Sequence, residues 1–173
     1  MHKPTDEKLM QQVANGNLDH LKILFERHHV HLFNFLHKMC GDRMLSEDIT
    51  QEVFYKLMKY RASYNNGKFV SWMFTIARNT LSTHYRRSNK NHEDIEMVAY
   101  SSTAGHEIVE DYSDLHLALN KLDASDRELI VLNRLQEIKY TELAEIVGST
   151  PGAVKTKVSR ALQKLKAIYF QKQ

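Results

Sequence analysis

Apolar residues recur every three or four positions along most of the chain, which is the spacing at which side chains share one face of an α-helix. The first long helical stretch ends near Cys40-Gly41-Asp42, because glycine permits the left-handed geometry that closes a helix. Its apolar positions are Leu21, Leu24, Phe25, Leu32, Phe33, Leu36 and Met39. Only two prolines and six glycines interrupt the 173 residues. The pattern predicts an all-α protein.

Two further helices are predicted in the first half of the chain. Ser46 suits the N-cap of the first of them, whose inner face holds Ile49, Val53, Phe54 and Leu57. The turn sequence Tyr64-Asn65-Asn66-Gly67 then separates it from the next helix. That helix carries inward Phe69, Trp72, Met73, Ile76, Ala77 and Leu81. We expect Trp72 to lie in the core, and a first domain to span residues 1–87.

The middle of the chain is predicted to be a linker. Residues 88–115 are polar, small and acidic with few regularly spaced apolar positions, so we expect a flexible connection. The helical period returns from Leu115, which predicts a second domain over residues 116–173. Within that domain, Ser125 and Glu128 fit the S-x-x-E capping box that begins a helix.

Charge is unevenly distributed, although the formal net value is only +3. No acid occurs from Val53 to His92, where the eight basic residues are Lys56, Lys59, Arg61, Lys68, Arg78, Arg86, Arg87 and Lys90. A second acid-free run follows Glu145 and contains Lys155, Lys157, Arg160, Lys164, Lys166 and Lys172. Between these runs, the linker carries seven acids and one base. Two basic regions around an acidic connector indicate a polyanion partner that is contacted in two places.

The segment YTELAEIVGSTPGAVKTKVS has the layout of a helix-turn-helix. Ala144 is small where the two helices would cross, and Gly148 tolerates a positive φ angle in the turn. Thr150 can cap the second helix, while Pro151 suits its first position, which needs no amide donor. A helical hairpin with a solvated basic face is the alternative.

A helical wheel assigns the two sides of this second helix. The buried side is predicted to hold Val154, Val158, Leu162 and Leu165. The outer side, which would meet base edges in a major groove, holds Ala153, Thr156, Ser159, Arg160 and Gln163. Flanking lysines that would reach phosphates are Lys155, Lys157 and Lys164.

Two stretches in the first half indicate which class of DNA-binding protein this is. In SEDITQEVF, a polar and acidic stripe opposite the apolar face holds Asp48, Gln51, Glu52 and Tyr55. Further along comes FVSWMFTIARNTLSTHYRR, which is aromatic and basic. These stretches resemble the extracytoplasmic-function (ECF) group of bacterial sigma factors, whose hallmarks look like D-x-x-Q-E-x-F and W-L-x-x-I-A-R-N followed by paired arginines. The resemblance covers nearly the whole chain.

The resemblance implies an alternative sigma factor that binds core RNA polymerase and directs transcription initiation through sigma regions 2 and 4. The stripe of Asp48, Gln51, Glu52 and Tyr55 would dock on a coiled coil of the largest catalytic polymerase subunit. Contacts to the opened −10 element would come from Asn65, Asn66 and Lys68 in the turn, with Arg78, Asn79, Arg86 and Arg87 on the next helix. The C-terminal helix would read the −35 element as duplex DNA. The resemblance also implies an anti-sigma factor, linked to the membrane.

Other classes are less well supported. A one-component helix-turn-helix regulator is the main alternative, and a nucleic-acid enzyme would need a catalytic constellation that we do not find, so we expect neither enzyme activity nor a small-molecule substrate. His28, His29, His31 and His37 lack the partners and directions of a metal site, and we expect no cofactor. The start of the chain has no apolar secretory stretch, which favours a cytoplasmic protein.

Overall fold

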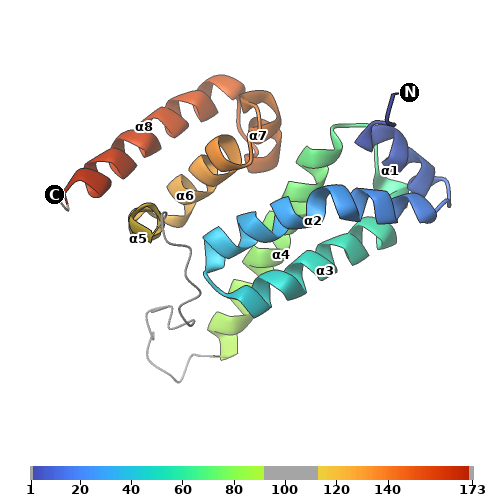
Figure 1. The fold of residues 1–173 in the computed structure, drawn as a ribbon, viewed down its shortest axis with the longest axis horizontal. Coiled ribbons are helices and arrows are strands. Elements are labelled where there is room, and N and C mark those ends of the chain that lie inside the picture. The colour runs from blue at the N-terminus through green and yellow to red at the C-terminus, as the bar shows by residue number, and fades with distance from the viewer. Residues whose placement is uncertain (1, 92–112, 172–173) are drawn as a thin grey trace. The chain divides into compact units, whose positions relative to one another are not determined.

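In a computed structural model that describes residues 2–91 and 113–171, every regular element is helical (Figure 1). The chain forms two compact units, Met1–Thr103 and Ala104–Gln173. The prediction of an all-α protein with two helical domains is thus confirmed. Most of the predicted linker, residues 88–115, lies outside the described residues, and the domain boundaries at 87 and 116 stay predictions.

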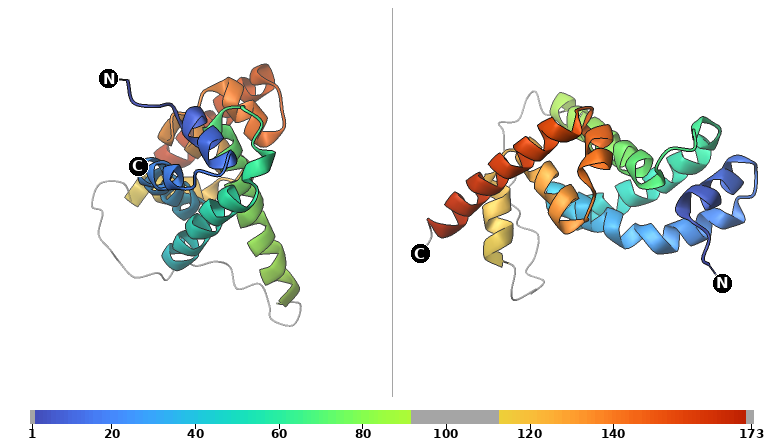
Figure 2. Two further views of the ribbon diagram at one scale, coloured as in Figure 1. Left: turned by 90° about the vertical axis from the view of Figure 1, so that its right-hand side faces the viewer. Right: turned by 90° about the horizontal axis from the view of Figure 1, so that it is seen from above.

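The first domain is a bundle built around α2. Its elements are α1 (Asp6–Ala14), α2 (Asp19–Cys40), α3 (Arg43–Lys59), the 3-10 turn η1 (Arg61–Ser63) and α4 (Phe69–Asn91). Helix α2 packs against α1 and α3, and α3 packs against α4 (Figures 1 and 2). Large side chains from all four helices are buried, and Phe35 of α2 meets Phe74 of α4 edge to face at 5.4 Å. Removal of these apolar surfaces from water holds the bundle together.

The junction between α2 and α3 is tighter than expected. Gly41 ends α2 with φ 69°, and its N–H donates to the carbonyl of His37, as predicted for a glycine cap. Helix α3 then begins at once, because the Asp42 carboxylate accepts from the backbone N–H of Leu45 (3.0 Å). The predicted N-cap at Ser46 is therefore wrong. Ser46 is buried one turn into α3, where its hydroxyl donates to the Asp42 carbonyl (2.6 Å).

The second domain is arranged along its last helix. Its elements are α5 (Ser113–Lys121), α6 (Ala124–Ile130), the π-helical turn η2 (Val131–Leu135), α7 (Tyr140–Val147) and α8 (Pro151–Phe170). Figure 2 shows α8 as one long helix against which α5, α6 and α7 pack. The predicted capping box at Ser125 is wrong, because Asp123 caps α6 by accepting from the N–H of Asp126 (2.8 Å).

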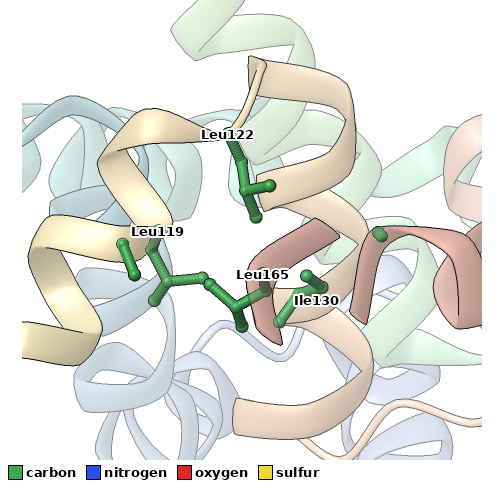
Figure 3. Close-up of a cluster of buried hydrophobic side chains, with 6 residues drawn as sticks. Leu119, Leu122, Ile130 and Leu165 are labelled. Carbon is green, nitrogen blue, oxygen red and sulfur yellow. The ribbon is translucent and has the colours of Figure 1, made fainter. Parts of the chain in front are cut away.

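A cluster of buried apolar side chains joins α5 to α6 and α8 (Figure 3). Its members are Ala118, Leu119, Leu122, Ile130, Ala161 and Leu165. Arg127 of α6 adds polar contacts at the end of α5, where it donates to the carbonyls of Leu119, Asn120 and Leu122. The carbonyls of Leu119 and Asn120 lie in the last turn of α5, and that of Leu122 lies just beyond it. One guanidinium therefore caps this end of the helix and fixes α6 against it.

One residue in the second domain has a costly backbone conformation. Glu137 lies between η2 and α7 with φ 57°, a region that costs an L-residue with a side chain about 1–2 kcal/mol. The next residue explains why the chain turns there. Ile138 is buried, its N–H donates to the carbonyl of Leu132, and its carbonyl accepts from Asn133.

We expect Glu137→Gly to stabilise the second domain. Glycine relieves the strain but loses more backbone entropy on folding, so the free energy of unfolding should rise by about 0.5–1 kcal/mol. Glu145→Gly is the matched control, because Glu145 is an exposed residue of α7, and there glycine should cost about 1 kcal/mol. Urea denaturation of the full chain measures both, and a loss of stability in Glu137→Gly would contradict the strain argument.

Candidate nucleic-acid interface

The helix-turn-helix forms from α7 and α8 as the sequence predicts. Gly148 ends α7 with φ 69°, and Ser149 donates its N–H to the carbonyl of Ala144. The Thr150 hydroxyl accepts from the N–H of Ala153 (3.3 Å), and Pro151 occupies the first turn of α8. Ala144 itself is buried. The turn chemistry therefore sets the crossing of α7 and α8.

The two faces of α8 separate as predicted. Val154, Val158 and Leu165 are buried, and Ala161 joins them although the wheel did not include it, while Leu162 is partly buried. All predicted DNA-facing residues are exposed: Ala153, Lys155, Thr156, Lys157, Ser159, Arg160, Gln163 and Lys164. A helix with one dry face and one polar, basic face has the form required to enter a major groove.

Lys164 has an internal partner that the sequence did not indicate. Its ammonium lies 2.9 Å from the carboxylate of Asp126 on α6, and the hydrogen bond that it donates to Asp126 raises the pKa of Lys164. The lysine remains exposed at the edge of the polar face. It can therefore exchange this carboxylate for a phosphate, because an ion pair that is exposed to water is weakened by solvent screening.

A compact loop between η1 and α4 presents the first set of predicted −10 contacts. The Tyr64 hydroxyl donates to the Gly67 carbonyl (2.6 Å), which closes the loop on itself. Asn66 takes φ 52°, a conformation that asparagine tolerates better than most residues. The side chains of Asn65, Asn66 and Lys68 are exposed. The loop thus offers polar groups on a fixed backbone.

Helix α4 continues from this loop and carries the remaining predicted −10 contacts. Asn79, Arg86 and Arg87 are exposed, whereas Arg78 is partly buried. Asn79 and Arg86 are seven residues apart and therefore share one side of the helix, two turns apart. The loop and this side of α4 both carry exposed polar or basic side chains in the first domain.

Trp72 is not a core residue, which corrects the prediction. It is partly exposed on α4, and its ring lies 5.2 Å from that of Tyr64. The buried aromatic residues on this helix include Phe69, as predicted, and Phe74, which the apolar pattern did not single out. Trp72 therefore packs against Tyr64 at the start of the loop and remains partly exposed.

The predicted polymerase-docking stripe on α3 divides into two parts. Asp48, Gln51 and Tyr55 are exposed. Glu52 instead faces α4, where its carboxylate lies 2.8 Å from His84 Nε2 and 3.2 Å from Lys56 Nζ. Lys56 also donates to the Thr80 hydroxyl of α4 (2.9 Å). Glu52 thus belongs to a polar contact between α3 and α4 as well as to the edge of the stripe.

The surroundings of Glu52 favour its ionised form. Burial alone would raise the pKa of this carboxyl, but the hydrogen bonds from His84 and Lys56 outweigh burial and hold the pKa below its usual value. The contact is therefore strongest when the carboxylate is charged.

An apolar groove beside the stripe was missed by the sequence reasoning. Phe25 was predicted to point inward but is 38% exposed. It stacks on His29 at 4.6 Å. The lining residues of the groove are Phe25, His29, Val30, Phe33, Arg43, Glu47, Thr50 and Gln51. Val30 could have indicated this groove from the sequence, because it is an apolar residue that does not fall on the buried face of α2.

Two of the histidines of α2 have contacts other than metal. His28 contacts Asp6, and His37 stacks on Phe33. Within the described residues, no three histidine, cysteine or acidic side chains lie together as metal ligands would. Among the described helices, none has the length and apolar character that crossing a membrane requires.

Two family models match the chain, one in each domain. Sigma-70 region 2 matches residues 24–91, and Sigma-70 region 4 matches residues 112–165. Among known proteins, the chain is similar to RNA polymerase sigma factor SigV of Bacillus subtilis, with 31% identity over 73% of this chain and 76% of SigV. It is also 28% identical to RNA polymerase sigma factor CarQ of Myxococcus xanthus, over 92% of this chain and 94% of CarQ.

Solved structures show the same fold. One is CnrH in complex with the cytosolic domain of CnrY, with a TM-score of 0.77 and 23% identity over 97% of this chain and 99% of that one. Another is the sigma factor RpoE of Bartonella quintana in complex with the anti-sigma factor NepR. It has a TM-score of 0.76 and 28% identity over 85% of this chain and 94% of that one.

The Glu52 contact predicts a pH-dependent stability. Because the folded pKa lies below the unfolded value, the stabilisation is present above the unfolded pKa of about 4.3 and is lost as the pH falls through the folded pKa. Glu52→Gln should therefore lower the free energy of unfolding at neutral pH and match the wild type in acid. The side chain is 35% exposed, so solvent screening should keep the effect below about 1 kcal/mol.

Urea denaturation at neutral pH and at about pH 3 checks this expectation. Asp48→Asn is the control, because Asp48 is exposed on the same helix and should change stability by less than about 0.5 kcal/mol. A deficit in Glu52→Gln of equal size at both pH values would show that the ionised carboxylate is not what stabilises the contact.

Proposed function

The chain belongs to the extracytoplasmic-function group of the sigma-70 family, and from this premise we infer that its two domains divide promoter recognition between them. It is an alternative sigma factor, which binds core RNA polymerase and directs promoter recognition and transcription initiation. We propose that residues 1–87 bind polymerase and open the −10 element, that residues 88–115 link the domains, and that residues 116–173 read the −35 element.

The observation that carries this proposal is the exposed face of α8. Its central side chains are polar or small and its flanking ones are lysines, while the opposite side is buried against α6 and α7. Polar side chains at the centre of such a helix can reach base edges, and lysines beside them can reach phosphates. We assign base reading to Ser159, Arg160 and Gln163, and phosphate contact to Lys155 and Lys157.

The loop and α4 support the −10 assignment. Opening duplex DNA costs about 1.4 kcal/mol for each stacked step that is lost. A protein that opens DNA without hydrolysing ATP must hold the extruded bases and the strand in compensation. Asn65 and Asn66 offer amide groups on a fixed loop, and Arg86 and Arg87 offer charges along the same helix that begins there.

The α3 stripe supports the docking assignment. Asp48, Gln51 and Tyr55 are available to a partner, whereas Glu52 is held by His84 and Lys56. We propose that Asp48 and Gln51 make the principal contacts with a basic surface of the polymerase coiled coil. This protein would act where core polymerase is found, in the cytoplasm.

An anti-sigma partner is also proposed. RpoE of Bartonella quintana, with which this chain shares 28% identity, was solved in complex with the anti-sigma factor NepR. We propose that a comparable protein, linked to the membrane, masks the polymerase- and DNA-binding surfaces of this chain.

Reconstitution tests the function directly. Purified core polymerase, the full chain and DNA carrying a matched promoter should give specific transcripts that core polymerase alone does not give. A one-component regulator would instead bind palindromic half-sites without polymerase. Failure of the chain to bind a competent core enzyme would reject the proposal.

Arg160→Ala and Lys157→Ala separate base reading from phosphate contact. If Arg160 makes a bidentate base contact, its removal should cost roughly 1–3 kcal/mol at one −35 position and relax the preference there. Lys157→Ala should weaken binding to all sequences alike and reduce the salt slope by about 1. Binding to a set of single-base −35 variants at several salt concentrations measures both. Equal losses on every sequence for both variants would contradict the division.

Asp48→Arg tests polymerase docking without removing the Glu52 carboxylate. Reversal of this charge against a basic partner should weaken core binding at least about tenfold, because like charges across an interface are costly. Glu26→Arg is the matched control, since Glu26 is an exposed acid on α2 whose contact with Lys22 spans 3.9 Å. Fluorescence anisotropy with labelled protein measures the affinity, and circular dichroism verifies the fold. An unchanged affinity in Asp48→Arg would exclude this docking site.

A further inference from the structure

Helix α4 begins after a residue whose side chain cannot cap it. The backbone N–H groups of a first helical turn have no partner inside the helix, and a Ser, Thr, Asp or Asn side chain just before the helix usually accepts from one of them. Here the preceding residue is Lys68, which has no acceptor. The N–H of Phe69 instead donates to Glu7 Oε1 at 3.2 Å, across 62 positions of sequence.

Glu7 is held in place by the packing of α1. Leu9, Met10 and Val13 are buried. Asp6 fixes the start of α1 to α2, because its two carboxylate oxygens contact Arg27 (2.9 Å) and His28 (2.8 Å). The hydrogen bond from His28 holds the pKa of Asp6 below its usual value despite burial. The carboxylate that caps α4 therefore lies on a helix that is packed and ion-paired against α2.

His28, which holds Asp6 at the start of α1, also contacts Phe69, the residue whose N–H Glu7 caps. The ring of His28 lies 5.2 Å from the ring of Phe69, and Phe69 is fully buried. Tyr64 lies at the other end of the loop. Burial of its hydroxyl, together with the negative charges of Glu7 and Asp6 on α1, raises the pKa of Tyr64 to about 12. The hydroxyl is therefore a donor at neutral pH, as its bond to the Gly67 carbonyl requires.

Glu7 places a negative charge close to the proposed DNA-binding loop. A carboxylate close to a surface that binds a DNA strand repels the phosphates, and Val53 to His92 contains no acid. A carboxylate at the N-terminus of a helix is, however, stabilised by the free N–H groups and the helix dipole. The hydrogen bond that Glu7 accepts from Phe69 thus explains its position. Its negative charge, in contrast, weakens the binding of DNA nearby.

We propose that Glu7 is a positioning residue for promoter opening, which fixes the start of α4 and thereby holds the loop from Asn65 to Lys68 in the conformation that captures a −10 base. This inference rests on the −10 function proposed for the loop. The family match in this domain begins at residue 24, after α1, so it does not extend to Glu7.

Two substitutions of Glu7 distinguish the effect of its side-chain length from the effect of its charge. Glu7→Gln keeps an oxygen acceptor at the same distance and removes the charge. Glu7→Asp keeps the charge, but its shorter side chain withdraws the carboxylate from Phe69. If Glu7 acts by position, Glu7→Asp should slow open-complex formation about fivefold to tenfold, while Glu7→Gln should stay within about twofold of the wild type. Glu26→Asp is the matched control on an exposed site of α2.

The measurement uses holoenzyme made from core polymerase and the full chain, with permanganate reactivity of the −10 thymines as the readout. Core affinity should be unchanged in all variants. Asn65→Ala should slow opening by itself, and Glu7→Asp should add little to it, because residues that act through one loop are not additive.

Each outcome bears on the proposal. Wild-type opening in Glu7→Asp, or slow opening in Glu7→Gln alone, would overturn it, the latter because charge and not position would then matter. Loss of core affinity in Glu7→Asp to the same extent as loss of opening would indicate a general structural role and also overturn it. Absence of specific transcripts with the wild-type holoenzyme would instead reject the proposed function itself, which keeps the two failures distinct.

Discussion

The satisfaction of backbone groups at helix ends determines where the contact surfaces of this protein lie. A helix leaves N–H groups unpaired at its start and carbonyls unpaired at its end. Asp42, Asp123 and Thr150 supply local acceptors at three starts, and Arg127 supplies donors at the end of α5. Each of these groups fixes the direction of the chain between two helices. Two of these connections matter for the proposed function. The loop before α4 carries proposed −10 contacts, and the turn before α8 sets the direction of the helix that carries the proposed −35 contacts.

Burial then decides which side of each helix remains for a partner. Val154 and Val158 occupy the dry side of α8, so the polar side must face away from the domain. On α2 the division is less complete. Phe25 and Val30 remain exposed because α3 covers only part of the helix, which leaves the apolar groove. A polar face and an apolar groove thus arise from the same constraint, since a helix cannot turn every apolar side chain toward one neighbour.

Local features of the sequence predicted the structure well where local chemistry decides it. Gly148 and Thr150 were placed correctly, because a positive φ angle and a capping hydroxyl are properties of single residues. Ser46 and Ser125 failed as caps, because an aspartate a few residues earlier can accept the same kind of N–H, and nothing in the sequence ranks the two. Spacing alone could not show that the ring of Phe74 is buried and that Trp72 is partly exposed. The contact between Glu7 and Phe69 leaves no local signal, since it depends on how α1 packs.

Charged residues that were predicted to contact partners also have internal contacts, and their strength differs with burial. Lys164 is exposed beside Asp126, and solvent screening weakens an exposed ion pair of this kind. Exchange of that carboxylate for a phosphate is therefore easy. Glu52 has two partners and is partly covered by α4, so its transfer to an outside partner would also leave His84 and Lys56 without their acceptor. A polymerase surface that approached α3 would thus gain more from Asp48 than from Glu52, although the two residues are equivalent in sequence pattern.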